Sequence, residues 1–285
     1  MKAYFLILLC IFPLVSPFGI WGPKEVQVTV DGNVGYLYQK WFSQSLIVYI
    51  GGGMANIVNP SYRENGRVKA LGSINSTGVE PEKGEKEFIE WLKTFPADLL
   101  YIKRYYTDGY DRGNFVMKMV NAVNKRYLSI NLIGFSGGGV VVALLIEQYH
   151  FERAVVISAP LYWFPQEYYD DFMEKNIFRC AKDAGKINTP TMLVYGLKDK
   201  VALPEYGATK FLEKAPKKLV VLKFYDCGHT IFNDPESAKK IRWDIWFFFY
   251  RQRFGIYNYP ENIAKVEASC SPLSEQLYAL QHISG

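Results

Sequence analysis

Histidine and cysteine are scarce in this sequence. Its 285 residues include 3 His and 4 Cys, and no two cysteines have the short spacing of metal ligands. We therefore expect no metal site. If an N-terminal signal that contains Cys10 is removed, three cysteines remain, and in an oxidising compartment they allow one disulfide and a free thiol, although the sequence does not give the pairing. The four cysteines are Cys10, Cys180, Cys227 and Cys270.

A basic stripe is also missing. The 33 Lys and Arg residues exceed the 28 Asp and Glu residues, which gives a net charge of +5. The positive charges are scattered, with short clusters at Lys217–Lys218 and Lys239–Lys240, whereas nucleic-acid-binding proteins concentrate them on one face. We therefore predict no nucleic-acid partner. A nucleotide phosphate loop is excluded as well, because no G-K-[ST] sequence stands in the right place.

The apolar run at the N-terminus is shorter than the ~20 residues that a membrane-spanning helix needs. It follows Lys2 and extends from Ala3 to Val15. A positive residue followed by such a run is typical of a secretory signal. We expect residues 1–19 to be a signal peptide or an uncleaved anchor with membrane association, and the protein to be secreted or anchored outside the cytoplasm. A buried N-terminal strand is the alternative.

Short apolar runs alternate with amphipathic segments along the chain. The first two runs flank Asp31-Gly32-Asn33 and predict an antiparallel hairpin. Later runs are unbroken, as in strands buried on both faces of a parallel sheet. The predicted strands are 25–30, 34–38, 46–50, 98–102, 128–133, 154–157, 191–195 and 219–224. The predicted helices are about 88–95, 112–126, 140–149, 205–212 and 235–251.

This alternation predicts one α/β domain at about residues 24–255, with a mostly parallel eight-stranded sheet and helices on both faces. Residues 54–81 are polar and predict a long loop. An aromatic-rich insertion at about 160–188 predicts a small cap, and residues 256–285 are a C-terminal extension. The pattern does not indicate an oligomeric state.

A serine lies between a predicted strand and a predicted helix, in Gly134-Phe135-Ser136-Gly137-Gly138. A G-x-S-x-G sequence in this context forms the tight turn that presents a nucleophilic serine at the carboxyl end of a sheet. The neighbours must be small because side chains there would clash with adjacent strands. We therefore predict Ser136 as a nucleophile. A glycine-rich turn with an idle serine is the alternative.

A serine is a weak nucleophile and needs a base. His229 follows the last predicted strand of the sheet, and ligand sites gather at the carboxyl ends of strands in open α/β sheets. His150 ends a predicted helix and His282 is among the last residues. We predict His229 as the general base, with a loop histidine of no special role as the alternative.

The acid that orients the histidine is expected after the strand before the last one. Asp199 stands there, in Tyr195-Gly196-Leu197-Lys198-Asp199. Asp226 is the nearest rival, but it lies very close to His229 in the sequence. We predict that Asp199 holds the imidazole tautomer and stabilises the imidazolium. A turn-capping aspartate is the alternative.

A tetrahedral intermediate also needs N–H donors for its oxyanion. The residue after the nucleophile, Gly137, supplies one, and the loop after the third strand supplies the other. Gly51-Gly52-Gly53 stands in that loop, and we predict the amide of Gly52 or Gly53 as the donor, with Met54 as a further candidate. Dinucleotide binding is the competing interpretation, but Asn56 replaces the third glycine of that pattern.

These segments, in this order, resemble the α/β-hydrolase superfamily from about Gln27 to Arg251. Gly139 extends the serine segment in a way that is similar to dienelactone-hydrolase-like and prolyl-oligopeptidase-like members. Ile50 departs from the pattern, since many esterases have His before the glycines of the oxyanion loop. The resemblance implies hydrolysis of an ester, thioester or amide without a metal or organic cofactor.

We therefore expect a serine hydrolase that cleaves a carboxylic ester through an acyl-enzyme intermediate. The expected substrate is a small-molecule or lipid-like acyl compound. A peptidase or a thioesterase of the same fold is the alternative among enzymes. A catalytically inactive binding protein on the same scaffold is the alternative from another class.

Overall fold

The computed structural model describes residues 24–52, 63–64, 67–68, 81–104, 113–123, 125–161 and 183–250. The strands of the main sheet are β1 (Lys24–Val30), β2 (Asn33–Gln39), β3 (Ser45–Ile50), β6 (Asp98–Arg104), β7 (Ser129–Phe135), β8 (Arg153–Ile157), β9 (Thr191–Gly196) and β10 (Val220–Tyr225). Each of the eight predicted strands coincides with one of these, so the strand pattern of the sequence is confirmed. A short ribbon, β4 (Arg63–Glu64) with β5 (Arg67–Val68), falls within the predicted long loop.

The eight strands form one sheet in the order β1-β2-β6-β3-β7-β8-β9-β10. At one end of the sheet, β2 runs antiparallel to both of its neighbours, β1 and β6. β6 and the remaining five strands are parallel to one another. All of the parallel strands therefore begin at one edge of the sheet and end at the other, and the candidate site lies at the edge where they end.

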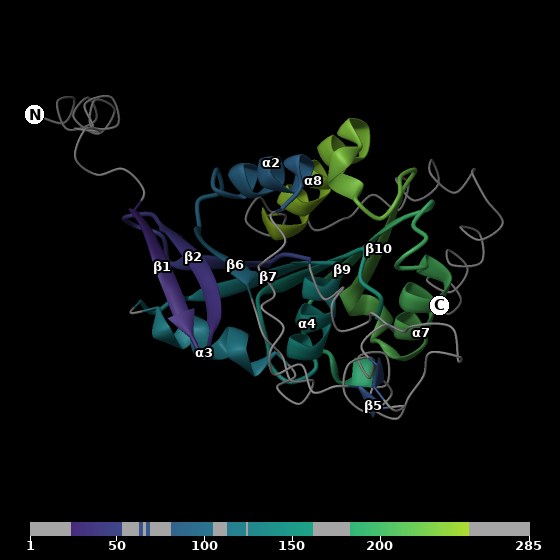
Figure 1. Ribbon diagram of the computed structural model, residues 1–285, viewed down its shortest axis with the longest axis horizontal. Coiled ribbons are helices and arrows are strands. Elements are labelled where there is room, and N and C mark those ends of the chain that lie inside the picture. Colours follow the sequence, from purple (N-terminus) through teal and green to yellow (C-terminus); the bar gives the residue numbers. More distant parts are fainter. Residues whose placement is uncertain are drawn as a thin grey trace, which may run out of the picture.

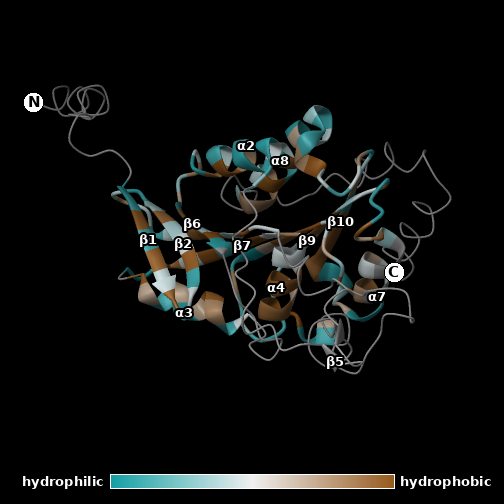
Figure 2. Ribbon diagram, in the orientation of Figure 1, coloured by the Kyte–Doolittle hydropathy of each residue, from teal (hydrophilic) through white to brown (hydrophobic). Residues whose placement is uncertain are grey.

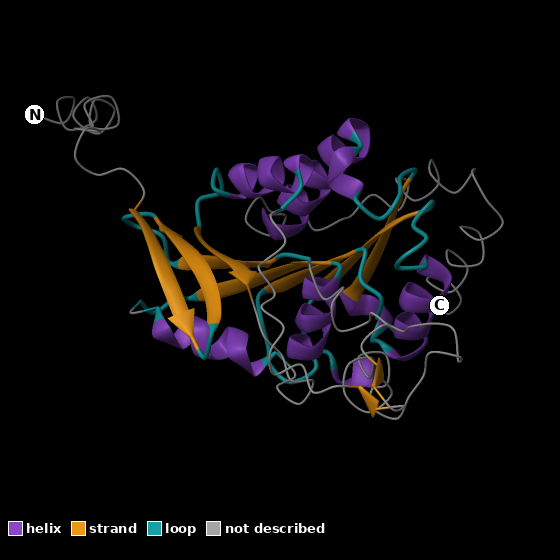
Figure 3. Ribbon diagram, viewed as in Figure 1, coloured by secondary structure: helices purple, strands orange, loops and turns teal. Residues whose placement is uncertain are grey.

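Helices cover both faces of the sheet (Figure 1). One face carries α2 (Lys83–Leu92) and α8 (Pro235–Tyr250), and the opposite face carries α3 (Asn114–Ala122), α4 (Gly137–Ile146) and α7 (Pro204–Lys214). Figure 3 shows the sheet in orange between these two layers of purple helices. The remaining short turns are the 3-10 helices η4 (Ala184–Lys186), η5 (Lys217–Leu219) and η6 (Ile231–Asn233).

The core follows from the apolar strands. β8 and β9 are buried along their whole length, as expected for parallel strands covered on both faces. Helix α4 is also buried at all of its 10 residues, and a helix that is apolar on every side is stable only inside the protein. Figure 2 shows the apolar strands and α4 in brown, with polar residues on the outward faces of α2 and α8.

The limits of three helices differ from the prediction, and one of them, α3, covers Asn114–Ala122 instead of about 112–126. Helix α2 begins at the polar residues Lys83 and Gly84 and ends at Leu92, while the buried Phe95 lies in the turn after the helix. Helix α4 begins at Gly137, directly after Ser136, instead of at Val140. Apolar spacing locates the buried face of a helix, but it does not mark a polar first turn or a glycine-rich one.

The mostly parallel eight-stranded α/β sheet predicted from the sequence is confirmed. The predicted N-terminal signal or anchor, most of the cap and all of the C-terminal extension lie outside the described residues. Among the helices that the structure describes, none combines the length and the apolar composition needed to cross a membrane.

Candidate active site

Ser136 lies in a strained turn between β7 and α4. Its backbone has φ 51° and ψ −119°, a conformation that residues other than glycine rarely adopt and that costs on the order of 1–3 kcal/mol. The Ser136 amide donates to the carbonyl of Ile157 at 2.8 Å, which ties the turn to the end of β8. The turn presents the serine at the carboxyl edge of the sheet, as the sequence predicted.

Glycines on both sides of the serine make this turn possible. A Cβ on Gly134 would lie 2.3 Å from the carbonyl oxygen of Gly138. A Cβ on Gly138 would lie 2.2 Å from the carbonyl oxygen of Ile50, at the end of β3. No side chain fits at either distance. The two glycines thus let α4 start directly against β7 and β3.

His229 reaches the serine from the loop after β10. Its Nε2 lies 3.0 Å from the Oγ of Ser136. The loop packs closely against the end of β9, because a Cβ on Gly196 would lie 2.4 Å from the carbonyl oxygen of Cys227. The imidazole side chain is 20% exposed, so it can exchange protons with bound substrate or water while its orientation stays fixed.

Asp199 holds the other nitrogen of the imidazole. Its Oδ2 lies 2.9 Å from Nδ1 of His229, and its Oδ1 accepts the amides of Val201 and Ala202, each at 2.8 Å. The carboxylate side chain is fully buried. Because Oδ1 is held by two backbone donors, Oδ2 is aimed at the histidine. This arrangement favours a proton on Nδ1 and an unprotonated Nε2 facing the serine.

The rival residues face elsewhere. Asp226 forms an exposed ion pair with Lys198 at 2.9 Å. The ring of His150 lies 3.3 Å from the side-chain oxygen of Asn188 on an exposed part of the surface. His282 lies outside the described residues. The structure therefore brings together Ser136 and His229 with Asp199, and not with Asp226.

The predicted oxyanion residues are only partly described. Gly137 is the first residue of α4 and directly follows Ser136. Gly52 lies beside the serine, because a Cβ there would be 3.4 Å from the Cβ of Ser136. Gly53 and Met54 lie outside the described residues. The preceding Gly51 lies against Glu85, because a Cβ on Gly51 would be 3.1 Å from the Oε1 of that residue.

Glu85 was not predicted as a site residue. It stands three and four positions before Phe88 and Ile89 on α2, so it shares their helix face, and it is buried with them. Burial raises the pKa of this carboxyl group, while the hydroxyl of Tyr49 and the Gly52 amide partly offset the rise. The sequence did contain one indication of this residue, since a charged side chain stands on the apolar face of the predicted helix.

Aromatic rings pack behind the histidine. Phe135 lies 5.5 Å from the ring of His229 and 5.1 Å from the ring of Phe232, measured between centroids. Phe232 in turn stacks on Phe88 of α2 at 4.4 Å. The loop that carries the histidine is therefore packed against both β7 and α2.

Cys227 lies two residues before the histidine as a buried free thiol. Burial raises the pKa of this thiol to about 11, so it stays protonated near neutral pH and is a poor nucleophile. Within the described residues, no group of His, Cys, Asp and Glu side chains is arranged to bind a metal ion. The other three cysteines lie outside that part of the chain.

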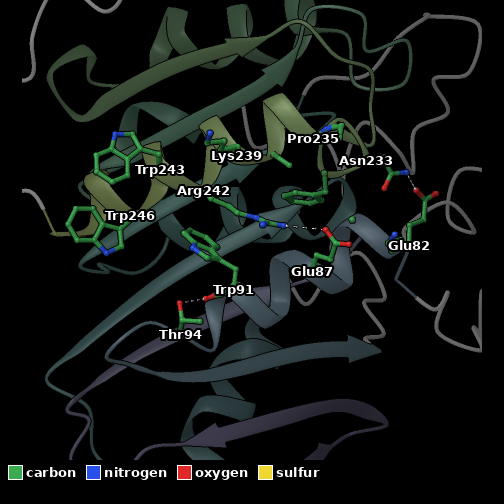
Figure 4. Close-up of a pocket in the computed structure, with 14 residues that line it drawn as sticks. Glu82, Glu87, Trp91, Thr94, Asn233, Pro235, Lys239, Arg242, Trp243 and Trp246 are labelled. Carbon is green, nitrogen blue, oxygen red and sulfur yellow. Dashed lines mark hydrogen bonds and ion pairs between the residues drawn. The ribbon is translucent and has the colours of Figure 1, made fainter. Parts of the chain in front are cut away.

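A groove of about 1130 Å³ lies between α2 and α8 (Figure 4). Trp91, Trp243 and Trp246 line it, together with the ion pair of Arg242 and Glu87 at 3.9 Å. Neither the serine nor the histidine of the candidate site is among its lining residues. It is therefore a surface feature of the helical layer and not the substrate pocket of that site.

Comparison with known proteins gives structural matches only. No protein-family model matches the sequence, and no curated protein matches it. Pf2001, an esterase from Pyrococcus furiosus, aligns with a TM-score of 0.58 and 17% identity over 81% of this chain and 93% of its own. Est1E from Butyrivibrio proteoclasticus aligns with a TM-score of 0.57 and 16% identity over 81% of this chain and 99% of its own. The chain has the α/β-hydrolase fold.

A longer protein shares this fold as well. An acylaminoacyl peptidase from Pyrococcus horikoshii has a TM-score of 0.58 and 12% identity, and the match covers 90% of this chain and 45% of the peptidase. The α/β-hydrolase fold predicted from the sequence is thus confirmed, and it is a hydrolase fold shared with esterases. At these identities the likeness concerns the fold and not the chemistry.

Proposed function

We propose that this protein is a serine hydrolase that cleaves a carboxylic ester through an acyl-enzyme intermediate. The observation that carries the proposal is the chain of two hydrogen bonds at 3.0 and 2.9 Å from Ser136 through His229 to Asp199. The strained backbone of the serine adds support, because strain of this kind clusters at active sites.

The proposed reaction begins with the serine. Its Oγ attacks the acyl carbon while Nε2 of His229 takes the hydroxyl proton. Asp199 keeps the Nδ1 proton in place and stabilises the imidazolium without taking its proton. The Gly137 amide, with a second amide from the loop after β3, binds the oxyanion; losing one such donor typically costs about 100- to 1000-fold in rate.

The intermediate then collapses in two stages. His229 returns its proton to the leaving oxygen, which departs as an alcohol and leaves the acyl group on Ser136. Water enters, His229 takes a proton from it, and the resulting tetrahedral intermediate releases the carboxylic acid and restores the serine hydroxyl. All of these steps use side chains and amides of the chain itself, and the proposal requires no cofactor.

The substrate class is proposed as a small-molecule or lipid-like acyl ester. The similarity to two structures named as esterases favours an ester, while the similarity to an acylaminoacyl peptidase supports an amide as the second candidate. Purified protein should be assayed on matched esters, thioesters and aminoacyl amides. We expect the highest kcat/KM for an ester, and a higher value for an amide would establish the peptidase alternative.

The Ser136→Ala variant tests the mechanism in the same assay. It should lose at least about 1000-fold of kcat, since removing the nucleophile leaves only binding and oxyanion stabilisation. Ser158→Ala is the matched control, because Ser158 is buried at the end of the neighbouring strand β8. Ester hydrolysis by the Ser136→Ala variant at the wild-type rate would refute Ser136 as the nucleophile. A folded wild-type protein that hydrolyses none of these substrates would leave the binding-protein alternative.

We further propose that the N-terminal segment directs the protein out of the cytoplasm or anchors it at a membrane. The apolar run Ala3–Val15 supports this. β1 begins at Lys24 and pairs with the end of β2, so the chain enters the sheet at the edge where the parallel strands begin. Trp41 and Phe42, which are 61% and 88% exposed, follow β2 at this edge. The candidate site lies at the opposite edge and would stay open to substrate.

Cell fractionation with intact-mass measurement tests this location. In a cell with a secretory pathway, we expect either a processed chain outside the cytoplasm or a full-length chain in the membrane fraction. Leu8→Arg, which puts a charge in the apolar run, should retain the protein in the cytoplasm. Full-length wild-type protein in the soluble cytoplasmic fraction would contradict the proposal.

A further inference from the structure

Glu85 is a buried carboxylate on a helix face that is otherwise apolar. It is 8% exposed and lies in the first turn of α2, on the face that also buries Phe88 and Ile89. Burying a carboxylate costs free energy unless hydrogen bonds replace its hydration. An apolar side chain would fill this position without that cost. The hydrogen-bond partners of the carboxylate must therefore explain why it is buried here.

Both partners of the carboxylate belong to β3 and the residues that directly follow it. The hydroxyl of Tyr49, in β3, donates to Oε1 of Glu85 at 2.6 Å. The backbone N–H of Gly52 acts on the same carboxylate and lowers its pKa, which partly offsets the effect of burial. Tyr49 is itself fixed, because its ring is fully buried and stacks on Tyr101 with 5.7 Å between centroids. Glu85 therefore ties the start of α2 to the end of β3.

The two glycines after β3 lie between this carboxylate and the serine. A Cβ on Gly51 would lie 3.1 Å from Oε1 of Glu85. A Cβ on Gly52 would lie 3.1 Å from the ring of Phe135 and 3.4 Å from the Cβ of Ser136. The backbone of this segment is thus in contact with Glu85 on one side and with the turn of the nucleophile on the other.

Helix α2 is also fixed relative to the histidine. A Cβ on Gly84 would lie 2.3 Å from the carbonyl oxygen of Phe232, in the short turn η6 that follows His229. Asn233 of the same turn donates to Glu82 at the start of α2, as Figure 4 shows. Glu85 thus stands on an element whose position is set by the loop that carries the proposed base.

We propose that Glu85 is a positioning residue of this hydrolase, which bonds to Tyr49, packs against Gly51 and so fixes the Gly51–Gly52 segment beside Ser136. The inference rests on the proposed function. The gain is preorganisation, because oxyanion donors stabilise the transition state only where they are held in place beforehand.

Kinetics on three variants test the role of the carboxylate. Glu85→Gln keeps an oxygen for both donors and should retain kcat within about threefold. Glu85→Leu removes the acceptor and should lower kcat roughly 10- to 100-fold with little change in KM, since a misplacement of about 1 Å can cost ~100-fold. Tyr49→Phe removes the hydroxyl donor but leaves the packing of Glu85 against Gly51, so we expect a smaller loss.

Amide hydrogen exchange gives a measurement that does not depend on activity. The peptide that contains Tyr49–Gly52 should exchange faster in Glu85→Leu than in the wild type, and Glu85→Gln should keep the wild-type rate. If the wild-type protein hydrolyses no ester, the proposed function fails, while the exchange rates still decide whether Glu85 holds the segment.

Two outcomes would overturn the inference. One is a folded Glu85→Leu variant with unchanged exchange and unchanged kcat. The other is a rise in kcat for that variant, which would mean that the carboxylate withholds a donor from the oxyanion. If Glu85→Leu does not fold, Glu85→Ser takes its place, because serine is too short to reach the Tyr49 hydroxyl or Gly51, and the same two outcomes apply.

Discussion

Asp199 lies beside His229 in space and Asp226 lies three residues before it in the sequence, yet the two carboxylates have different partners. Asp199 bonds to the imidazole and to two backbone amides, whereas Asp226 pairs with Lys198 at the surface. Asp199 lies three positions after the end of β9, where the Val201 and Ala202 amides hold its Oδ1. Asp226 directly follows the end of β10, where its side chain is exposed beside Lys198.

Replacing the two aspartates by asparagine should give opposite results. Asp199→Asn should lower kcat on the order of 10⁴-fold, because an amide in this position stabilises the wrong imidazole tautomer. Asp226→Asn is the matched control and should leave kcat unchanged. Steady-state kinetics on one ester substrate check both variants. Equal losses in the two, or a loss only in Asp226→Asn, would show that the acid is assigned to the wrong residue.

The buried carboxyl of Glu85 should make stability depend on pH. Burial raises its pKa above the ordinary value of about 4.3, so the protonated form is favoured in the folded state. Its contribution to stability is complete below the ordinary pKa and is lost as pH rises through the raised value. The hydroxyl of Tyr49 and the carboxylate of Glu82 are the titratable groups that act on it.

Urea unfolding of the wild type and of Glu85→Gln between pH 4 and pH 8 checks this. The variant should gain stability relative to the wild type as pH rises above about 4.3. Glu87→Gln, which removes an exposed carboxylate from the same helix, is the matched control. A difference between wild type and Glu85→Gln that stays constant over this range would contradict the prediction.

At the residue scale, the sequence predicted the residues whose signal is local. Ser136 is marked by its glycine neighbours, and His229 and Asp199 by the strands that precede them. Glu85 could not be assigned in this way, because its partners are Tyr49 and Gly52, far away in the sequence. A carboxylate on the apolar face of a helix indicates burial, but only the packed structure shows which residues the carboxylate contacts.

At the scale of elements, the site depends on the close packing of β3, β7 and α4. Gly138 is the point where the first turn of α4 passes over the end of β3. A Cβ there would lie 2.2 Å from the carbonyl oxygen of Ile50 and 2.6 Å from that of Gly51. These oxygens belong to the backbone, so a larger residue would have to displace either the helix or the loop after β3.

Gly138→Ala should therefore impair both stability and activity. We expect a loss of about 1–3 kcal/mol in the free energy of unfolding, which is typical of overpacking, and a lower kcat because Ser136 and the loop after β3 move apart. Gly185→Ala is the control, since its Cβ would meet only the carbonyl oxygen of Lys214 at 3.3 Å. Wild-type stability and kcat in Gly138→Ala would mean that this packing does not position the site.

The sequence predicted the existence of the elements better than their ends. The strands could be found because alternation and unbroken apolar runs are local patterns. The starts of α2 and α4 were missed, because the first turns contain glycine and charged residues whose burial is set by contacts with η6 and β3. Such contacts join residues far apart in the sequence, and no local pattern contains them.

At the scale of the whole molecule, the two edges of the sheet differ in character. The edge where the parallel strands end carries the serine, the histidine and the aspartate. The opposite edge is held by Asp98, a fully buried carboxylate that bonds to Lys125 at 2.8 Å and to Tyr127 at 2.9 Å. The polar groups of one edge form the candidate site. Those of the other edge join the start of β6 to the residue after β2, through the Lys40 amide, and to the segment before β7.

The most direct measurement is labelling with a fluorophosphonate probe, followed by peptide mapping of the adduct. The account predicts one adduct, on Ser136, in the wild type. Ser136→Ala should not be labelled, and His229→Ala should be labelled at least about 100-fold more slowly, because the base that activates the serine is missing. A folded wild-type protein that is not labelled, or an adduct on another residue that persists in Ser136→Ala, would contradict the account.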